Sequence, residues 1–454
     1  MESLLFRTFE LANKLIKSEL ENRLMPKVAP EQLKQELDLT LPEGGNSEDI
    51  VFEKMEAVLQ ATPQTSNTRF LNQLFGGREK TAAAADMLTA LTNVSMYTFK
   101  SAGVQILIEQ QLINHMASFA GFKEAEGIIC PGGSLANLMG MMMGRDYANP
   151  NFRETGNDNR RHTFYVSEEC HYSVNKGAAV LGVGRKNVRK IKCNGSGEIL
   201  TQELELQLQK DLQKGYVPCA VIATSGTTVL GAFDPIEKLA DICEQYGVWL
   251  HVDGAFGGAA LLHHEYRKLL KGLERADSFV WDAHKVMGIP LTCSILLCQR
   301  KGQLSKSIKE DAQYLFQADN DELNPGVRSI QCGRRNDAFK LWAAWQALGD
   351  NGWGERLERQ MNLAKIAATY IKESDVLELC QWPNFLTICF KVNGIDAIKA
   401  CELLHEEGQA IISHAKVRNE NVIRLVTINP DTSPEQIKAT LQNIESKQSK
   451  LITA

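Results

Sequence analysis

Lys285 carries the most informative chemistry in this sequence. It lies between the runs 278–281 and 286–291, both rich in apolar side chains. Lysine is strongly hydrated and is seldom buried without a reason. A lysine in a dry cleft can form a Schiff base, which is the chemistry that the cofactor pyridoxal 5'-phosphate (PLP) requires. Asp253 ends the apolar run 248–252 and is suited to pair with the ring nitrogen of PLP, so the two residues together predict a PLP enzyme.

Three further segments have residue types that would complete such a site. The Gly-Gly-Ser turn at 132–134 opens a helical pattern, and backbone N–H groups there favour a phosphate, although such a turn is more often a plain helix cap. His171 follows a strand-like run and could stack on the pyridine ring, but a lone histidine there is more often a core or capping residue. Thr224 lies in a hydroxyl-rich strand end that could equally be a simple turn. Their joint occurrence with Lys285 and Asp253 favours the PLP site.

The composition indicates a soluble, cytoplasmic protein. The chain has 454 residues, of which 44% are hydrophobic and 23% charged, and its formal net charge is -5. This mild acidity argues against broad nucleic-acid binding, and the eleven cysteines, with no CxxC pair, indicate a reducing compartment. No signal-peptide-like or membrane-spanning apolar run is present, so no membrane association is expected. The sequence also has no GxGxxG, P-loop or HExxH motif, and we expect neither NAD nor a metal.

Three segments are expected along the chain. Residues 1–61 have a helical pattern and should pack on the body or on a second subunit. Residues 62–333 alternate apolar strands with helices, which predicts a mainly parallel sheet covered on both faces, with ligands at the carboxyl ends of its strands. Residues 334–454 should form a small α+β domain that begins with helices at 337–348 and 354–372. Strands are predicted at 127–130, 162–166, 188–191, 219–223, 248–252, 278–281, 293–297, 385–390 and 422–426.

Ordered motifs over about residues 67–430 resemble those of the group II PLP-dependent amino-acid decarboxylases, in the branch of glutamate decarboxylase and cysteine sulfinate decarboxylase. The resemblance is carried by the segments 69–74, 131–134, 171–173, 227–235, 251–253, 284–285, 314–317 and 331–334. It implies PLP fold type I, an aspartate-aminotransferase-like α/β architecture. It also implies a homodimer with its active site at the subunit interface. The implied reaction is α-decarboxylation of an acidic L-amino acid, namely glutamate, aspartate or cysteine sulfinate.

The resemblance assigns roles to individual residues. Lys285 would bind PLP covalently, Asp253 would keep the ring nitrogen protonated, and His171 would stack over the ring. The remaining cofactor shell would consist of Gly133, Ser134, Thr224, Ala255 and His284. The substrate would be contacted by Gln73, Phe75 and Arg424. Arg424 suits a carboxylate because its guanidinium is a planar fork, although a strand arginine can also be a surface residue.

Several features depart from the family pattern. Many glutamate decarboxylases carry a tyrosine that reprotonates the substrate carbon in a mobile loop, whereas the segment 318–329 contains none. The proton would then come from elsewhere, for example from His171 or a water molecule. The dipeptide 282–283 reads Asp-Ala where relatives often have Asn-Pro. Arg78 and Lys100 stand where relatives often have acidic residues, and they could favour a short or strongly anionic substrate or be solvated surface charges.

Other functions remain open from the sequence. The substrate could be another amino acid such as 2,4-diaminobutyrate. The same fold also supports PLP-dependent aminotransferases and lyases, and the missing loop tyrosine would suit a non-catalytic member of the fold.

Overall fold

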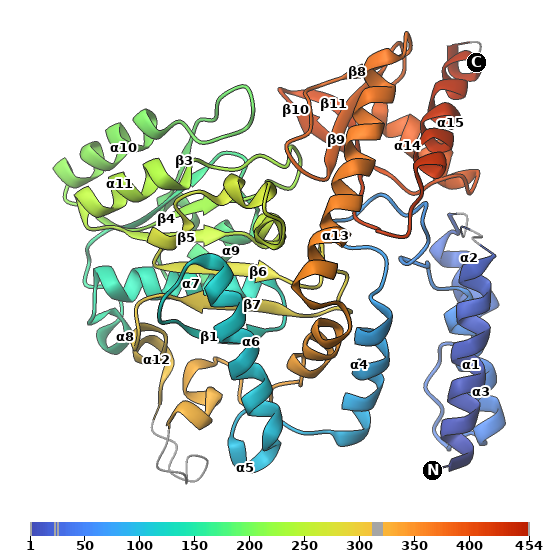
Figure 1. Cartoon of the computed structure of the whole chain (residues 1–454), viewed down its shortest axis with the longest axis horizontal. Coiled ribbons are helices and arrows are strands. Elements are labelled where there is room, and N and C mark those ends of the chain that lie inside the picture. Colours follow the sequence, from blue (N-terminus) through green and yellow to red (C-terminus); the bar gives the residue numbers. More distant parts are fainter. Residues whose placement is uncertain (1, 22–23, 25–26, 311–320, 453–454) are drawn as a thin grey trace. The chain divides into compact units, whose positions relative to one another are not determined.

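The computed structural model describes residues 2–21, 24, 27–310 and 321–452 (Figure 1). Its contacts divide the chain into two compact units. Unit 1 comprises Met1–Gly77, Leu363–Trp382 and Ile388–Ala454, and unit 2 comprises Arg78–Asn362 and Pro383–Thr387. The three-part division at residues 61 and 333 stays a prediction. Over the described ranges, none of the helices combines the length and apolarity needed to cross a membrane.

Unit 2 is built on a seven-stranded sheet in the order β1-β7-β6-β5-β4-β2-β3. From β6 to β3 all neighbouring strands are parallel, whereas β7 runs antiparallel to both β1 and β6. This confirms the mainly parallel sheet. The strands are β1 (Glu126–Cys130), β2 (His162–Ser167), β3 (Val188–Ile191), β4 (Val217–Thr224), β5 (Trp249–Asp253), β6 (Ser278–Asp282) and β7 (Ser294–Cys298).

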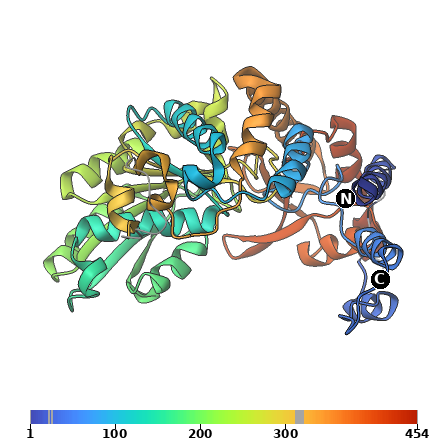
Figure 2. The ribbon, with the colours of Figure 1, turned by 90° about the horizontal axis from the view of Figure 1, so that it is seen from below.

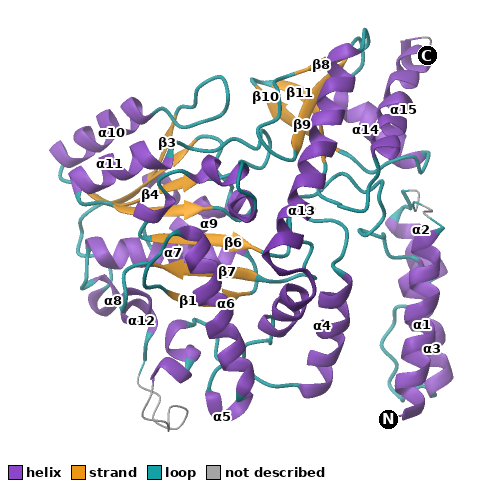
Figure 3. Ribbon diagram, viewed as in Figure 1, coloured by secondary structure: helices purple, strands orange, loops and turns teal. Residues whose placement is uncertain are grey.

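Helices cover this sheet because its strands are apolar on both faces. Every residue of β2, β5, β6 and β7 is buried, as expected for a sheet enclosed between helices. Figures 2 and 3 show the helices of unit 2 around this sheet. Helix α7 packs against β4 to β7, while α10 and α11 pack against β4 and α11 also against β5. The α-helices of unit 2 before residue 338 are α4 (Lys80–Thr92), α5 (Phe99–Ala102), α6 (Val104–Ala120), α7 (Gly133–Ala148), α8 (Phe152–Thr155), α9 (Ser173–Val180), α10 (Thr201–Gln213), α11 (Ile236–Tyr246) and α12 (Gln303–Ile308).

Helix α7 lies unusually close to β5. A Cβ atom added to Gly140 would fall 2.2 Å from the imidazole of His251, so only glycine permits this approach. His251 is fully buried, and its ring nitrogens lie 2.8 Å from Ser278 Oγ and 2.9 Å from Asn137 Oδ1. These contacts tie α7 to β5 and β6. They therefore fix the start of α7 relative to the ends of those strands.

Unit 1 contains a four-stranded sheet in the order β10-β11-β9-β8. Strands β10 and β11 form a hairpin whose two turn residues, Arg418 and Asn419, both have positive φ, as in the turns that match the twist of paired strands. The strands are β8 (Leu377–Leu379), β9 (Thr387–Val392), β10 (Ser413–Val417) and β11 (Glu420–Val426), and the helices are α1 (Glu2–Leu20), α2 (Pro30–Glu36), α3 (Glu48–Gln60), α14 (Ala397–Glu406) and α15 (Pro434–Ile452). Strands β8 and β10 were not predicted from the sequence.

The two helices predicted at 337–348 and 354–372 form one run, α13 (Ala338–Glu373). The run contains a kink at Gly349, whose φ of 59° and ψ of -178° are not helical. Glycine accepts this backbone conformation without the steric cost that a side chain would bring. The prediction was correct in placing a break there and wrong in expecting a longer connection.

Candidate active site

Three neighbouring parallel strands of unit 2 end in buried polar residues. Strand β4 ends at Thr224, β5 at Asp253 and β6 at Asp282. Thr224 and Asp253 are register partners, and Asp253 is paired with a residue two positions before Asp282. Because parallel strands end at one edge of a sheet, these side chains gather where α/β proteins bind ligands.

Lys285 lies in the turn that follows β6, and its amine lies near the carboxylate of Asp282, the last residue of that strand. Its side chain is 22% exposed, and Nζ lies 3.4 Å from Asp282 Oδ2. His284 Nε2 lies 3.7 Å from the same oxygen, and burial lowers the pKa of His284. From the sequence, Asp282 was identifiable only as a departure from the family pattern. The structure places this buried carboxylate next to the amine of Lys285.

The Gly-Gly-Ser turn lies at the same edge as these residues. Strand β1 runs in the same direction as β6, because both are antiparallel to β7, and the turn follows β1 directly. Gly132 has a φ of +109° and is the N-cap of α7 without a side-chain cap, and Ser134 is exposed. A Cβ atom on Gly133 would fall 2.5 Å from Asp282 Oδ2, so glycine is needed there. The turn therefore leaves an open helix start beside Asp282.

The polar atoms at this edge fit PLP. Thr224 Oγ1 and Ser225 Oγ are buried and have no hydrogen-bond partner within the part of the chain that the structure describes. Most buried polar groups in proteins are satisfied, so these two hydroxyls, next to Asp253 at the strand ends, are available to a polar ligand. Asp253 is buried, and its Oδ1 accepts a hydrogen bond from the backbone N–H of Ala255 at 3.1 Å. The carboxylate of Asp253 is thus available to the ring nitrogen of PLP and the amine of Lys285 to its aldehyde. The unpaired hydroxyls are available to the polar substituents of the cofactor.

His171 lies beyond the end of β2, within electrostatic reach of the other groups. Burial is the main cause that lowers its pKa, while Asp253 and Asp282 raise it and Lys285 lowers it. The imidazole packs against Tyr172 at 4.2 Å between ring centroids. Tyr172 was not predicted to belong to the site, although it is adjacent to His171 in the sequence.

Unit 1 brings together the residues predicted to contact substrate. Arg424 on β11 is buried, which lowers its pKa. Its Nη2 donates to the carbonyl oxygen of Asn72 at 2.6 Å, and its Nε donates to Ser413 Oγ at 2.9 Å. Gln73, the next residue after Asn72, is exposed, and Phe75 is half-buried. Arg424 is therefore not a surface strand arginine, and it anchors the segment that carries Gln73 and Phe75.

The other residues noted in the sequence lie elsewhere. Arg78 is half-buried, and Lys100 is exposed on α5. The motif 314–317 and residues 318–320 of the tyrosine-free segment lie outside the described residues. The rest of that segment forms two short 3-10 helices, Asp321–Leu323 and Pro325–Arg328.

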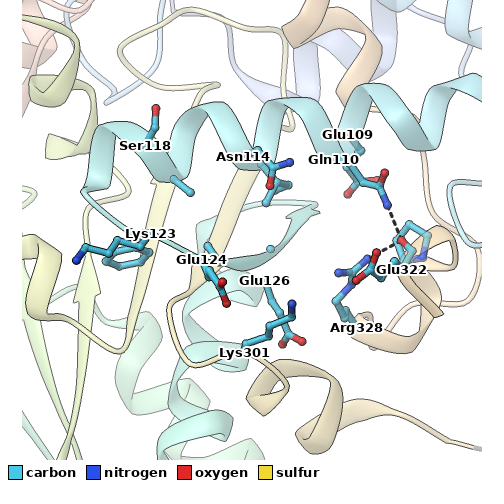
Figure 4. Close-up of a pocket in the computed structure, with 16 residues that line it drawn as sticks. Glu109, Gln110, Asn114, Ser118, Lys123, Glu124, Glu126, Lys301, Glu322 and Arg328 are labelled. Carbon is cyan, nitrogen blue, oxygen red and sulfur yellow. Dashed lines mark hydrogen bonds between the residues drawn. The ribbon is translucent and has the colours of Figure 1, made fainter. Parts of the chain in front are cut away.

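A separate polar cavity of about 530 Å³ opens in unit 2 (Figure 4). Its wall includes Glu109 and Asn114 of α6, Glu126 of β1, and Arg328. Glu126 begins β1, whereas the Gly-Gly-Ser turn follows the other end of that strand. The cavity therefore lies away from the strand ends that carry Lys285 and Asp253.

Comparison with known proteins defines the class of this chain. The family model of the pyridoxal-dependent decarboxylase conserved domain matches residues 30–393. The chain is 36% identical over 462 aligned residues to the acidic amino acid decarboxylase GADL1 of Xenopus tropicalis, covering 96% of this chain and 90% of that protein. It is 40% identical over 366 residues to the cysteine sulfinic acid decarboxylase of Homo sapiens, covering 80% of this chain and 74% of that protein. The crystal structure of mouse CSAD matches with a TM-score of 0.93 and 33% identity over 98% of each chain.

The chain belongs to the pyridoxal-dependent decarboxylase family. The predicted α/β fold, the PLP cofactor and the classification as a PLP-dependent amino-acid decarboxylase are confirmed.

Proposed function

We propose that the chain catalyses α-decarboxylation of an acidic L-amino acid, glutamate, aspartate or cysteine sulfinate, and releases CO2 and the corresponding amine. The observation that carries this proposal is the buried guanidinium of Arg424, which anchors the segment of Gln73. A guanidinium fork suits the side-chain carboxylate or sulfinate of such a substrate. Relatives with 36–40% identity that are acidic amino acid or cysteine sulfinic acid decarboxylases support the same substrate class.

The cofactor residues have distinct roles in this proposal. Bound PLP supplies an electron sink for the carbanion left by CO2. Lys285 provides the amine that holds the cofactor, and Asp253 holds a proton on the ring nitrogen, an interaction that strengthens as charge develops. His171 orients the substrate against the ring. The phosphate and the rest of the ring would be contacted by the remaining residues of the cofactor shell, Gly133, Ser134, Thr224, Ala255 and His284.

Asp282 gives the amine of Lys285 a partner within the site. Its carboxylate oxygen lies 3.4 Å from Nζ, and its second oxygen, Oδ1, is buried without a hydrogen bond among the described residues. An unpaired buried charge has a large desolvation cost, and pairing Lys285 with Asp282 offsets part of this cost for both groups. We infer that Asp282 holds the amine at the strand end whenever Lys285 is not bonded to the cofactor.

We propose that substrate selection is a property of unit 1. Arg424 would bind the side-chain acid, Gln73 would add an N–H donor, and Phe75 would border the apolar part of the substrate. Nε and Nη2 of Arg424 already donate to Ser413 and to the carbonyl of Asn72, both uncharged, so these contacts orient the guanidinium without neutralising its charge.

We also propose a cytoplasmic homodimer whose active site lies at the subunit interface. All eleven cysteines are free, which suits a reducing compartment. Helices α1 and α3 expose apolar side chains, with Phe6 65% and Phe9 57% exposed, and such surfaces favour association. Light scattering of the purified protein would give twice the mass of one chain, whereas a monomer would contradict the dimer.

A substrate panel tests the proposed function. Purified protein with PLP is incubated with aspartate, glutamate, cysteine sulfinate and 2,4-diaminobutyrate, and both CO2 and keto acid are measured. We expect CO2 and amine from at least one acidic substrate and none from 2,4-diaminobutyrate. CO2 from the basic amino acid alone would contradict the role of Arg424, and keto acid without CO2 would indicate an aminotransferase.

A further inference from the structure

Ser173 contacts one ring nitrogen of His171 twice. The backbone N–H of Ser173 donates to Nδ1 at 3.3 Å, and Ser173 Oγ lies 2.7 Å from the same atom. A backbone N–H can only donate, so Nδ1 is the unprotonated, accepting nitrogen of the ring. The hydroxyl then donates to Nδ1 as well, which leaves the imidazole proton on Nε2.

The surroundings of His171 also favour its neutral form. Burial is the largest cause that lowers its pKa. The charges that face it are Asp253 and Asp282, which raise the pKa, and Lys285 and Lys176, which lower it. The two donors from Ser173 act in the same direction as burial, because a protonated Nδ1 could not accept them.

We propose that Ser173 is a positioning residue that fixes His171 as a neutral hydrogen-bond donor through Nε2. A neutral imidazole releases its N–H proton far less readily than an imidazolium does. His171 therefore orients a substrate group with its Nε2–H and is not the acid that protonates the substrate carbon. The proposal rests on the proposed function only in placing His171 in the active site, and it selects against one of the two proton sources that the sequence left open.

The tautomer can be observed directly in the resting holoenzyme. Protein labelled with ¹⁵N at its nine histidines is compared with the His171→Gln variant, which lacks the signal of interest. We expect a protonated Nε2 and an unprotonated Nδ1 near neutral pH. A proton on Nδ1, or on both nitrogens, would overturn the proposal. No substrate is present, so this result does not depend on which amino acid is decarboxylated.

A second test uses the pH dependence of decarboxylation. Ser173→Ala removes one donor to Nδ1 and should lower kcat/KM about fivefold, the usual effect of one hydrogen bond. It should also raise the pKa of His171 and move the acidic limb of the kcat/KM profile to higher pH. Ser173→Thr keeps the hydroxyl and should restore the wild-type limb.

Ser167→Ala is the matched control. Ser167 Oγ accepts the backbone N–H of Glu169 at 3.1 Å, in a similar local turn that does not involve His171. This change should leave the acidic limb in place even if it lowers the rate. If Ser173→Ala lowers activity without moving the limb, Ser173 has only a structural role and the proposal fails. If the panel of acidic substrates yields no CO2 but the tautomer is as expected, the proposed substrate class fails and this inference stands.

Discussion

Unit 2 and unit 1 assemble their candidate residues in different ways. In unit 2, Thr224, Asp253 and Asp282 each end a parallel strand, so the sheet itself brings them together. In unit 1, Arg424 reaches the segment of Gln73 through a backbone carbonyl, a contact between residues far apart in the sequence. The first arrangement follows from topology and the second from a particular side-chain contact. We therefore expect changes in unit 2 to abolish the chemistry and changes in unit 1 to alter which substrate is bound.

Replacement of Lys285 by alanine should have the largest effect. Loss of a residue that bonds to the reacting system lowers rates by many orders of magnitude, and we expect a loss of about 10⁴-fold or more in kcat together with loss of the bound cofactor's absorbance band. The control is Lys271→Ala, which removes an exposed ion pair with Glu237 and should change little. Retention of the absorbance band in Lys285→Ala would mean that another lysine holds the cofactor.

Replacement of Asp253 by asparagine should come next. The variant keeps the shape of the side chain but loses the charge that holds a proton on the ring nitrogen. Removal of one electrostatic contact that strengthens in the transition state costs about 10²–10³ in kcat. The cofactor should still bind, as measured by absorbance, so the loss should appear in kcat more than in KM. A loss confined to KM would place Asp253 outside the chemical step.

Arg424→Lys tests the role of unit 1. Lysine keeps the charge but lacks the planar fork, and the loss of a bidentate contact should raise KM for the acidic substrate about tenfold or more, with a smaller effect on kcat. Lys391→Arg is a matched cation change on β9, where Lys391 forms an ion pair with Glu420, and should leave KM unchanged. Equal effects on KM and kcat would indicate that Arg424 supports the fold and does not select the substrate.

The smallest expected effect is on thermal stability and concerns Asp234, which holds the backbone of Thr224. Asp234 accepts the backbone N–H groups of Thr224 at 2.7 Å and Ile199 at 2.8 Å, and burial raises its pKa to about 7. Since this pKa lies above that of the unfolded chain, the stabilisation from the protonated carboxyl group is complete below about pH 4 and is lost as the pH rises to about 7. The melting temperature of the wild type relative to that of Asp234→Asn should therefore fall between about pH 4 and about pH 7, by about 2 °C for each kcal/mol of stabilisation lost. A difference that is independent of pH would contradict the raised pKa.

Much of unit 2 could be predicted from the sequence because its strands are continuous apolar runs. The observed β3 has the predicted bounds, and β1 and β6 differ from theirs by one residue at one end. Asp253 was identifiable because it directly follows such a run, at the edge where α/β proteins bind ligands, and Lys285 because it lies between two apolar runs. The short strands β8 and β10 were missed, since three residues, or a strand with polar residues such as Ser413 and His414, give little periodic signal.

The site residues that were not predicted depend on particular contacts that only the structure shows. Asp282 becomes important because the Gly-Gly-Ser turn and Lys285 both lie against it. Ser173 contacts one nitrogen of His171 twice in a local turn, and although the motif 171–173 includes both residues, the sequence does not show which ring nitrogen is contacted. Ser413 likewise gains its role only when the hairpin of β10 and β11 brings it to Arg424.

We propose that the strand-end edge of unit 2 holds PLP on Lys285. Reduction of the holoenzyme with borohydride, followed by peptide mass spectrometry, tests it most directly. We expect a single pyridoxyl adduct, on Lys285, that is absent when Lys285 is replaced by alanine. An adduct on any other lysine of the reduced holoenzyme, in place of Lys285, would contradict it.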